Sequence, residues 1–216
     1  MHQVELHSIQ SNTHPDFPEI IRIYRQSFDI SEQVPLQNLL PQAEKEFQEA
    51  HLLSVHFQGQ VAGMISVFVS KNASLAYLDY LAVAPELRSR GLGSAILAGL
   101  RRYLLSQPTW KLEPLLGICL EAADPSEEGI DDSTHRERIR RIDFYVRNGG
   151  FVLDHVDYFA PQINPNLQPP KYCLLVLPCQ PGWIPQARED VRLILDTILL
   201  YGYGISQNQE AYYRWK

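Results

Sequence analysis

The chain has 216 residues, 45% hydrophobic and 20% charged, so it is long and apolar enough to bury a sizeable core. Its formal net charge of -6 argues against nucleic acid as the main partner, because phosphate binding needs a basic face. No run approaches the ~18 apolar residues of a membrane span, and the N-terminus lacks the apolar stretch of a signal peptide. We therefore expect a cytoplasmic protein with no membrane partner.

The first part of the chain predicts one helix followed by strands. Apolar residues recur at helical spacing between Pro15 and Phe28, with Asp16 as a favourable charge at the start. The polar stretch from Gln42 to Ala50 could form a short helix. Three strands are then expected, over residues 52–57, 61–69 and 73–83. Gly63, inside the second strand, indicates a close approach of another backbone.

The remainder alternates helices and strands. Helices are expected over residues 94–105, 137–147 and 186–200, and strands over 115–121, 151–160 and 172–177. The acidic stretch 122–135 predicts an exposed loop, which is either only solvated or a rim that attracts a cationic substrate. Asn148-Gly149-Gly150 is typical of a helix C-cap. Because the strands are too interleaved for two cores, we predict one α/β domain over residues 1–216, with a mixed sheet and helices on both faces.

The three cysteines are odd in number and form no C-x-x-C pair, which argues against a disulfide framework and a zinc site. The seven histidines show no ligand spacing either. His51 and His56, five residues apart, would face opposite ways on one strand. The sequence therefore predicts no metal cofactor.

A glycine-bearing turn, Arg88-Ser89-Arg90-Gly91-Leu92-Gly93, lies where a strand passes into a helix. Glycines allow several backbone N–H groups to face one point, and the helix start adds unpaired donors. Pyrophosphate is the natural ligand. The turn fits neither a P-loop, because no Gly-Lys-Ser/Thr follows, nor a dinucleotide fingerprint, because the third glycine is absent. A second Gly-x-Gly at Gly202-Tyr203-Gly204 has no strand before it, and we interpret it as a chance match.

The turn resembles the R/Q-x-x-G-x-G/A signature of the GCN5-related N-acetyltransferases (GNAT), and Leu81-Ala82-Val83 with Pro85 matches the strand end before that signature. A second segment, Arg141 to Phe151, is similar to the family's A-x-x-F-Y-x-x-x-G-F segment, with one extra glycine. The resemblance covers about residues 5–178. Residues 179–216 would be a C-terminal helical extension.

The resemblance implies the acyl-CoA N-acyltransferase fold, with a mostly antiparallel sheet of about six or seven strands. It implies acetyl-CoA as cosubstrate and a primary amine, on a small molecule or a protein, as acceptor. The family often forms homodimers. The alternative is a non-catalytic acyl-CoA-binding sensor or interaction module. The positions that would hold acetyl-CoA are Leu81, Ala82, Val83, Arg88, Ser89, Arg90, Gly91, Leu92, Gly93 and Ser94.

Three residues are catalytic candidates. Tyr145 falls on the family's general-acid position, where a phenol would protonate the departing thiolate; otherwise it is a core tyrosine. Glu121 ends an apolar strand, where carboxylates are uncommon, and could be the base, hold the acceptor amine or cap the next loop. Asp79 could relay a proton through water or form a salt bridge. The acceptor is expected to contact residues 24–40 and 160–171, which carry no motif.

Overall fold

The computed structural model describes residues 3–41, 48–70, 74–107, 114–162, 166–167, 171–185 and 187–215. The strands are β1 (Glu5–Ser8), β2 (Gln48–Phe57), β3 (Gln60–Ser70), β4 (Leu75–Val83), β5 (Gly117–Ala123), β6 (Phe151–Val152), β7 (Val156–Tyr158), β8 (Tyr172–Pro178) and β9 (Tyr213–Trp215). The helices are α1 (Phe17–Ser27), α2 (Leu92–Leu105), α3 (Asp132–Arg147) and α4 (Arg188–Thr197), and α4 continues as a π-helical turn, η4 (Ile198–Gly202). The short 3-10 turns are η1 (Leu36–Asn38), η2 (Pro85–Leu87) and η5 (Gln209–Tyr212).

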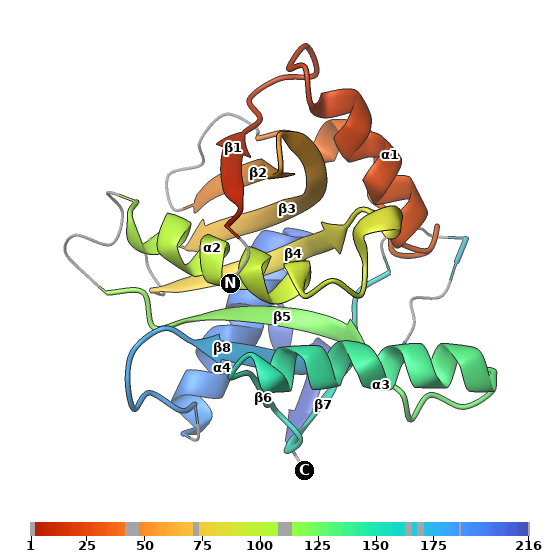
Figure 1. The fold of residues 1–216 in the computed structure, drawn as a ribbon. Coiled ribbons are helices and arrows are strands. Elements are labelled where there is room, and N and C mark those ends of the chain that lie inside the picture. Colours follow the sequence, from red (N-terminus) through yellow and green to blue (C-terminus); the bar gives the residue numbers. More distant parts are fainter. Residues whose placement is uncertain are drawn as a thin grey trace.

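Seven strands form one sheet in the order β1-β2-β3-β4-β5-β8-β6 (Figure 1). Among the described residues β4 and β5 are its one parallel pair, and the other neighbours are antiparallel. The strands β7 and β9 pair separately, as a second small sheet. The mixed, mostly antiparallel sheet of six or seven strands is therefore confirmed.

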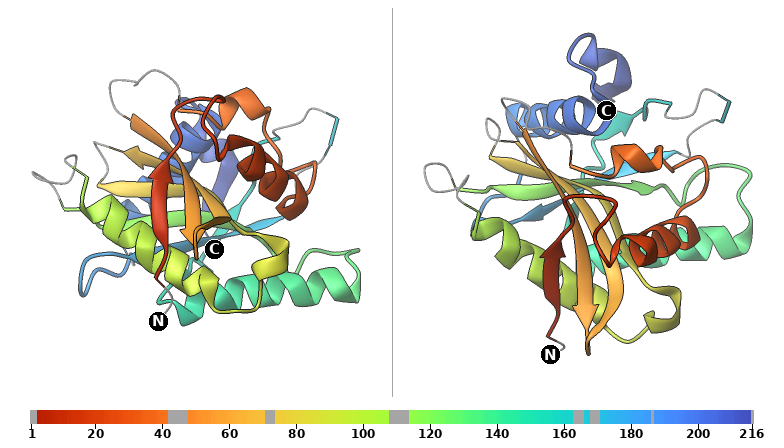
Figure 2. Two further views of the ribbon diagram at one scale, coloured as in Figure 1. Left: turned by 45° about the horizontal axis from the view of Figure 1, so that its top comes forward. Right: turned by 90° about the horizontal axis from the view of Figure 1, so that it is seen from above.

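Helices cover both faces of the sheet, as predicted (Figure 2). Helices α1 and α2 bury apolar stripes that include Ile20, Ile23, Ile96 and Leu100 in one core cluster, to which α3 adds Tyr145. Helix α4 lies on the opposite face, where its buried residues join a second cluster with side chains of β4, β5 and β8. None of the described helices is long and apolar enough to cross a membrane.

Strands at the edges of the sheets differ from the prediction. The sequence pattern did not indicate β1 or β9, which are short and are held by pairing with distant strands. The sequence predicted a short helix over residues 42–50. Residues 48–50 instead begin β2, because they continue its pairing with the end of β3. Residues 42–47 lie outside the described part. The strand expected over 151–160 is divided into β6 and β7, which belong to different sheets.

Helix α3 begins five residues earlier than predicted, inside the stretch expected to be a loop. The carboxylate of Asp131 accepts hydrogen bonds from the N–H groups of Ser133 and Thr134, which caps the first turn. At the other end, Gly149 adopts φ +85° and the Gly150 N–H bonds to the Tyr145 carbonyl. The predicted glycine C-cap is therefore confirmed.

Gly63 lies where β3 and β4 approach closely, as the sequence indicated. A Cβ at this position would lie 2.5 Å from the carbonyl oxygen of Ala82. Because that oxygen belongs to the backbone of a central strand, it has little freedom to move away.

We expect Gly63→Ala to lower the free energy of unfolding by about 1–3 kcal/mol, because the added methyl group overpacks the sheet. Urea denaturation of both proteins measures the change. Gly59→Asn is the control, since nothing lies within 4 Å of a Cβ there and asparagine tolerates its φ of +78°. Equal losses in the two variants would contradict this account.

Candidate active site

The parallel pairing of β4 and β5 ends in the middle of the sheet. Leu78 and Leu120 are the last paired positions, and beyond them the two strands separate, as the arrowheads in Figure 1 show. β4 remains paired with β3 on its other side as far as Val83. The edge of β4 that faces β5 therefore has no partner strand after Leu78 among the described residues.

A cavity of about 70 Å³ lies at this fork. Asp79 and Glu121 are the first residues beyond the β4–β5 pairing, and they line the cavity together with Tyr145 of α3. Five further lining side chains are aromatic: Phe28, Tyr77, Tyr80, Tyr172 and Tyr203. Three residues selected independently in the sequence thus lie around one cavity.

Asp79 is a bulged residue. Ser66 pairs with Tyr80 and the adjacent Val67 pairs with Leu78, so Asp79 has no opposite residue on β3. Its Oδ2 accepts a hydrogen bond from the Ser66 hydroxyl at 3.3 Å. Burial, and then the nearby charge of Glu121, raise the pKa of Asp79 to about 8. We therefore expect this carboxyl to be mostly protonated at neutral pH.

Glu121 is held by two phenols. The Tyr77 hydroxyl donates to Oε2 at 2.7 Å, and the Tyr203 hydroxyl lies 2.9 Å from Oε1 and 3.0 Å from Oε2. Burial raises the pKa of Glu121, and the surrounding tyrosine hydroxyls oppose that rise. Because these hydrogen bonds favour the ionised form, we assign the negative charge of the carboxyl pair to Glu121 and the proton to Asp79.

Tyr145 reaches the cavity from the last turn of α3 and is only 7% exposed. Burial raises its pKa to about 12, against the opposing charge of Arg141. The phenol is therefore protonated at neutral pH and is available as a proton donor. The extra glycine of this segment lies beyond the tyrosine, in the helix cap, and leaves Tyr145 on the cavity wall.

The glycine turn forms the start of α2. Gly91 is the N-cap residue with φ +75°, and no side chain caps the helix, which leaves its first N–H groups available to an anion. Arg88 is directed elsewhere, because its guanidinium donates to the Val83 carbonyl and the Ser27 hydroxyl. Gly93 serves packing, since a Cβ there would lie 2.9 Å from the Phe144 ring.

Comparison with known proteins bears on the family and the fold. Residues 17–112 match the model of the Acetyltransferase (GNAT) family. The resemblance to the GNAT family is thereby confirmed. A protein from Bacteroides thetaiotaomicron, described as a GNAT-family acetyltransferase, has a TM-score of 0.70 at 21% identity, covering 94% of this chain and 99% of its own. The chain matches none of the curated proteins with which it was compared.

Two further solved structures show the same GNAT fold at lower similarity. The ribosomal-protein-S18-alanine N-acetyltransferase of Escherichia coli has a TM-score of 0.53 at 17% identity, with 84% of this chain and 99% of that one covered. A GNAT-family protein of Desulfovibrio desulfuricans has a TM-score of 0.53 at 16% identity, with 82% and 99% covered. The family match contains Asp79 and the glycine turn, whereas Glu121 and Tyr145 lie beyond residue 112.

Tyr203 was not predicted as a site residue, because it lies in the Gly-x-Gly that we interpreted as a chance match. A Cβ on Gly202 would lie 2.7 Å from Cε1 of Tyr77, so the glycine allows the chain to pass directly over that ring. This close passage brings the Tyr203 hydroxyl to Glu121. A glycine and a tyrosine directly after a long apolar helical stripe were the only sequence signal.

A larger cleft of about 690 Å³ adjoins the cavity and shares Phe28, Glu32, Ala123 and Arg141 with it. Its charged lining residues are Asp29, Glu32, Arg88, Glu127, Glu128, Glu137, Arg138 and Arg141. The predicted acceptor region 24–40 thus contributes to both hollows, and the acidic stretch 122–135 forms part of the rim. No described residue of the other predicted region, 160–171, lines either hollow.

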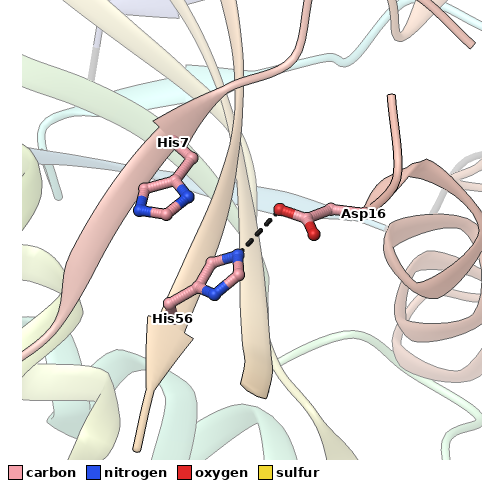
Figure 3. Close-up of side chains that lie close together, drawn as sticks. All are labelled: His7, Asp16 and His56. Carbon is pink, nitrogen blue, oxygen red and sulfur yellow. Dashed lines mark hydrogen bonds and ion pairs between the residues drawn. The ribbon is translucent and has the colours of Figure 1, made fainter. Parts of the chain in front are cut away.

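Three side chains outside the cavity are the group that could hold a metal in the described part of the chain. His7 of β1, Asp16 and His56 of β2 have ligand atoms within 4.8 Å of one another (Figure 3). The two imidazoles, however, stack with centroids 4.3 Å apart and planes at 21°. Stacked rings direct their nitrogens in parallel and not toward one point, so we interpret the group as a cluster in which Asp16 and His56 are hydrogen-bonded and His7 stacks on His56.

Asp16 is the centre of that cluster. It is the N-cap residue of α1, yet its carboxylate does not cap the helix. Oδ2 instead accepts from the Ser54 hydroxyl at 2.6 Å and lies 2.7 Å from Nε2 of His56. Burial acts to raise the pKa of Asp16, but these contacts outweigh it and the pKa is lowered.

We expect Asp16→Ala to lower the free energy of unfolding by about 1–2 kcal/mol at pH 7, because the variant loses charged hydrogen bonds that tie α1 to the sheet. Since folding lowers this pKa, the stabilisation is present above the ordinary aspartate pKa of about 3.9 and is lost as the pH falls below it. Urea denaturation at pH 7, 5 and 3 measures the difference. Asp143→Ala, at an exposed position of α3, should change little. A loss that persists undiminished at low pH would contradict this assignment.

Proposed function

We propose that this protein transfers an acetyl group from acetyl-CoA to a primary amine of a small molecule or a protein. The observation that carries the proposal is the fork, where Asp79, Glu121 and Tyr145 line one cavity beside an unpaired strand edge. A neutral amine, a positioned thioester and a proton donor for the leaving thiolate are what the reaction needs. The family match supports acyl transfer over other uses of such a cavity.

The donor would lie along β4 and the start of α2. In this proposal the free edge from Leu81 to Val83 pairs with the pantetheine arm, as an added strand would. The uncapped N–H groups of Leu92, Gly93 and Ser94 face the pyrophosphate, with Arg90 close in sequence. Arg88 would have to exchange its contacts with Val83 and Ser27 to reach a phosphate.

The acceptor would bind as an ammonium against the charge of Glu121. Loss of its proton to Glu121, directly or through water, frees the lone pair that attacks the thioester carbonyl. Asp79, with a pKa of about 8, would exchange this proton with solvent. The backbone N–H near Val83 would stabilise the charge that develops on the carbonyl oxygen.

Tyr145 would then protonate the departing thiolate, and its phenolate would take up the second proton that the amine nitrogen loses as the amide forms. An ordinary thiol has a pKa of about 8.5, lower than that of the Tyr145 phenol, which by itself opposes the transfer. The thiolate, however, forms inside the same low-dielectric cavity, where desolvation makes it more basic as well. The difference in pKa between the thiol and the Tyr145 phenol is thereby reduced.

We also propose that residues 1–216 fold as one domain, with a core of about residues 5–178 and an extension over 179–216. The extension is not a separate unit in this proposal, because Val191, Ile194 and Leu195 of α4 are fully buried in a cluster with sheet residues.

Thermal unfolding with acetyl-CoA, with ATP and NAD as controls, tests the donor. At about 100 times its Kd the ligand adds about 2.7 kcal/mol of stability, which should raise Tm by roughly 5–10 °C in a chain of this size. A rise with acetyl-CoA alone is expected. No rise, or an equal rise with ATP, would contradict the proposed donor site.

We expect Tyr145→Phe to lower kcat about 100-fold for any amine that the wild-type protein acetylates, with the acetyl-CoA-dependent rise in Tm unchanged. Release of free CoA thiol measures the rate. Tyr103→Phe, which removes a half-buried hydroxyl of α2, is the matched control and should leave kcat unchanged. Binding of acetyl-CoA without turnover of any amine by the wild-type protein would favour the non-catalytic acyl-CoA-binding module.

A further inference from the structure

We propose that the C-terminal extension is part of the active site and that Tyr203 is the positioning residue that holds the Glu121 carboxylate. The inference rests on the proposed function, because it concerns the group that would receive the acceptor amine. Tyr203 lies far outside the family match, which ends at residue 112.

The extension is anchored before it reaches the site. Helix α4 and the turn η4 bury Val191, Ile194, Leu195, Ile198 and Leu199 in the second core cluster, which also contains Tyr77. The chain then forms the π-helical turn η4, and such turns are frequent at functional sites. The ring of Tyr77 and the extension are thus packed as one unit on this face of the sheet.

The glycines on either side of Tyr203 fix the position of its backbone. Gly202 lies against the Tyr77 ring, where any side chain would collide with it. Gly204 adopts φ +70°, and its N–H bonds to the Leu200 carbonyl at 3.0 Å. The backbone is therefore held on both sides of Tyr203, and the phenol is directed at the fork by local structure as well as by its own hydrogen bond.

The Glu121 carboxylate receives hydrogen bonds from two different parts of the fold. Tyr77 donates from β4, and Tyr203 donates from the extension to within 2.9 and 3.0 Å of the two oxygens. The other titratable groups that interact with Glu121 or line its cavity are Glu32, Asp79, Tyr80, Cys119, Arg141, Tyr145, Tyr158 and Tyr172. The arrangement fixes the orientation of a carboxylate that burial alone would tend to neutralise.

Removal of the Tyr203 hydroxyl should therefore make Glu121 easier to protonate. A hydrogen bond to an ionised group favours that form, so its loss raises the pKa of the carboxyl. If the ionised carboxylate accepts the proton of the amine, kcat/KM falls at pH values below this pKa. Activity should return as the pH is raised and Glu121 ionises again.

The test is the pH profile of kcat/KM for Tyr203→Phe, with an amine found by screening the wild-type protein. The acid limb should move upward by about one pH unit, with an approximately tenfold loss on that limb and recovery at high pH. KM for acetyl-CoA should not change. Tyr201→Phe is the matched control, because that hydroxyl lies in the same segment but accepts a hydrogen bond from Ser70.

A second readout does not require activity. Carbon-13 NMR titration of the glutamate carboxyl groups, with Glu121→Gln for assignment, should show the same upward shift of the Glu121 pKa in Tyr203→Phe. Failure of the proposed function would be seen as no turnover by the wild-type protein, whereas failure of this inference would be seen in the titration. An unchanged Glu121 pKa, or an equal shift in Tyr201→Phe, would overturn it.

A variant that keeps the shape of the side chain covers the case in which Tyr203→Phe does not fold. Replacement of Tyr203 by 3-fluorotyrosine makes the phenol a stronger donor. The Glu121 pKa and the acid limb should then move downward, opposite to the shift in Tyr203→Phe. An upward shift, or none, would also overturn the inference.

Discussion

The separation of β4 and β5 after the Leu78–Leu120 pair is the constraint on which the rest of the site depends. In an uninterrupted sheet Asp79 and Glu121 would be neighbours within a continuous ladder. The fork instead places a cavity between them and frees one edge of β4. The same interruption of hydrogen bonding thus provides a surface for an extended ligand and brings two carboxyl groups together.

Two carboxyl groups in one small cavity cannot both ionise without a large free-energy cost from charge repulsion. The environment therefore has to favour ionisation of one carboxyl group over the other. Here the distinction is made by hydrogen bonds: Asp79 receives one long bond from Ser66, whereas Glu121 receives short bonds from Tyr77 and Tyr203. One of these phenols belongs to the C-terminal extension. In the proposed mechanism, the charge state of the fork therefore depends on the packing of residues 188–204 against the sheet.

Periodicity and glycine chemistry predicted most of the regular structure, because amphipathic helices and the cap at Gly149 are determined locally. They did not predict β1 or β9, which exist through pairing with distant strands. The site residues divide in the same way, into those with a local signal in the sequence and one that depends on a distant contact. Glu121 could be selected from its strand end, Asp79 from its place within a predicted strand and Tyr145 from a motif, but Tyr203 could not be selected, since it contacts Glu121 across 82 residues.

The central claim is that the unpaired edge of β4 and the start of α2 hold acetyl-CoA. Hydrogen–deuterium exchange with and without acetyl-CoA tests this most directly, because both regions would bind it through backbone N–H groups. The account predicts slower exchange confined to peptides that contain residues 79–83 and 91–94. Protection elsewhere, with unchanged exchange in those two segments, would contradict it.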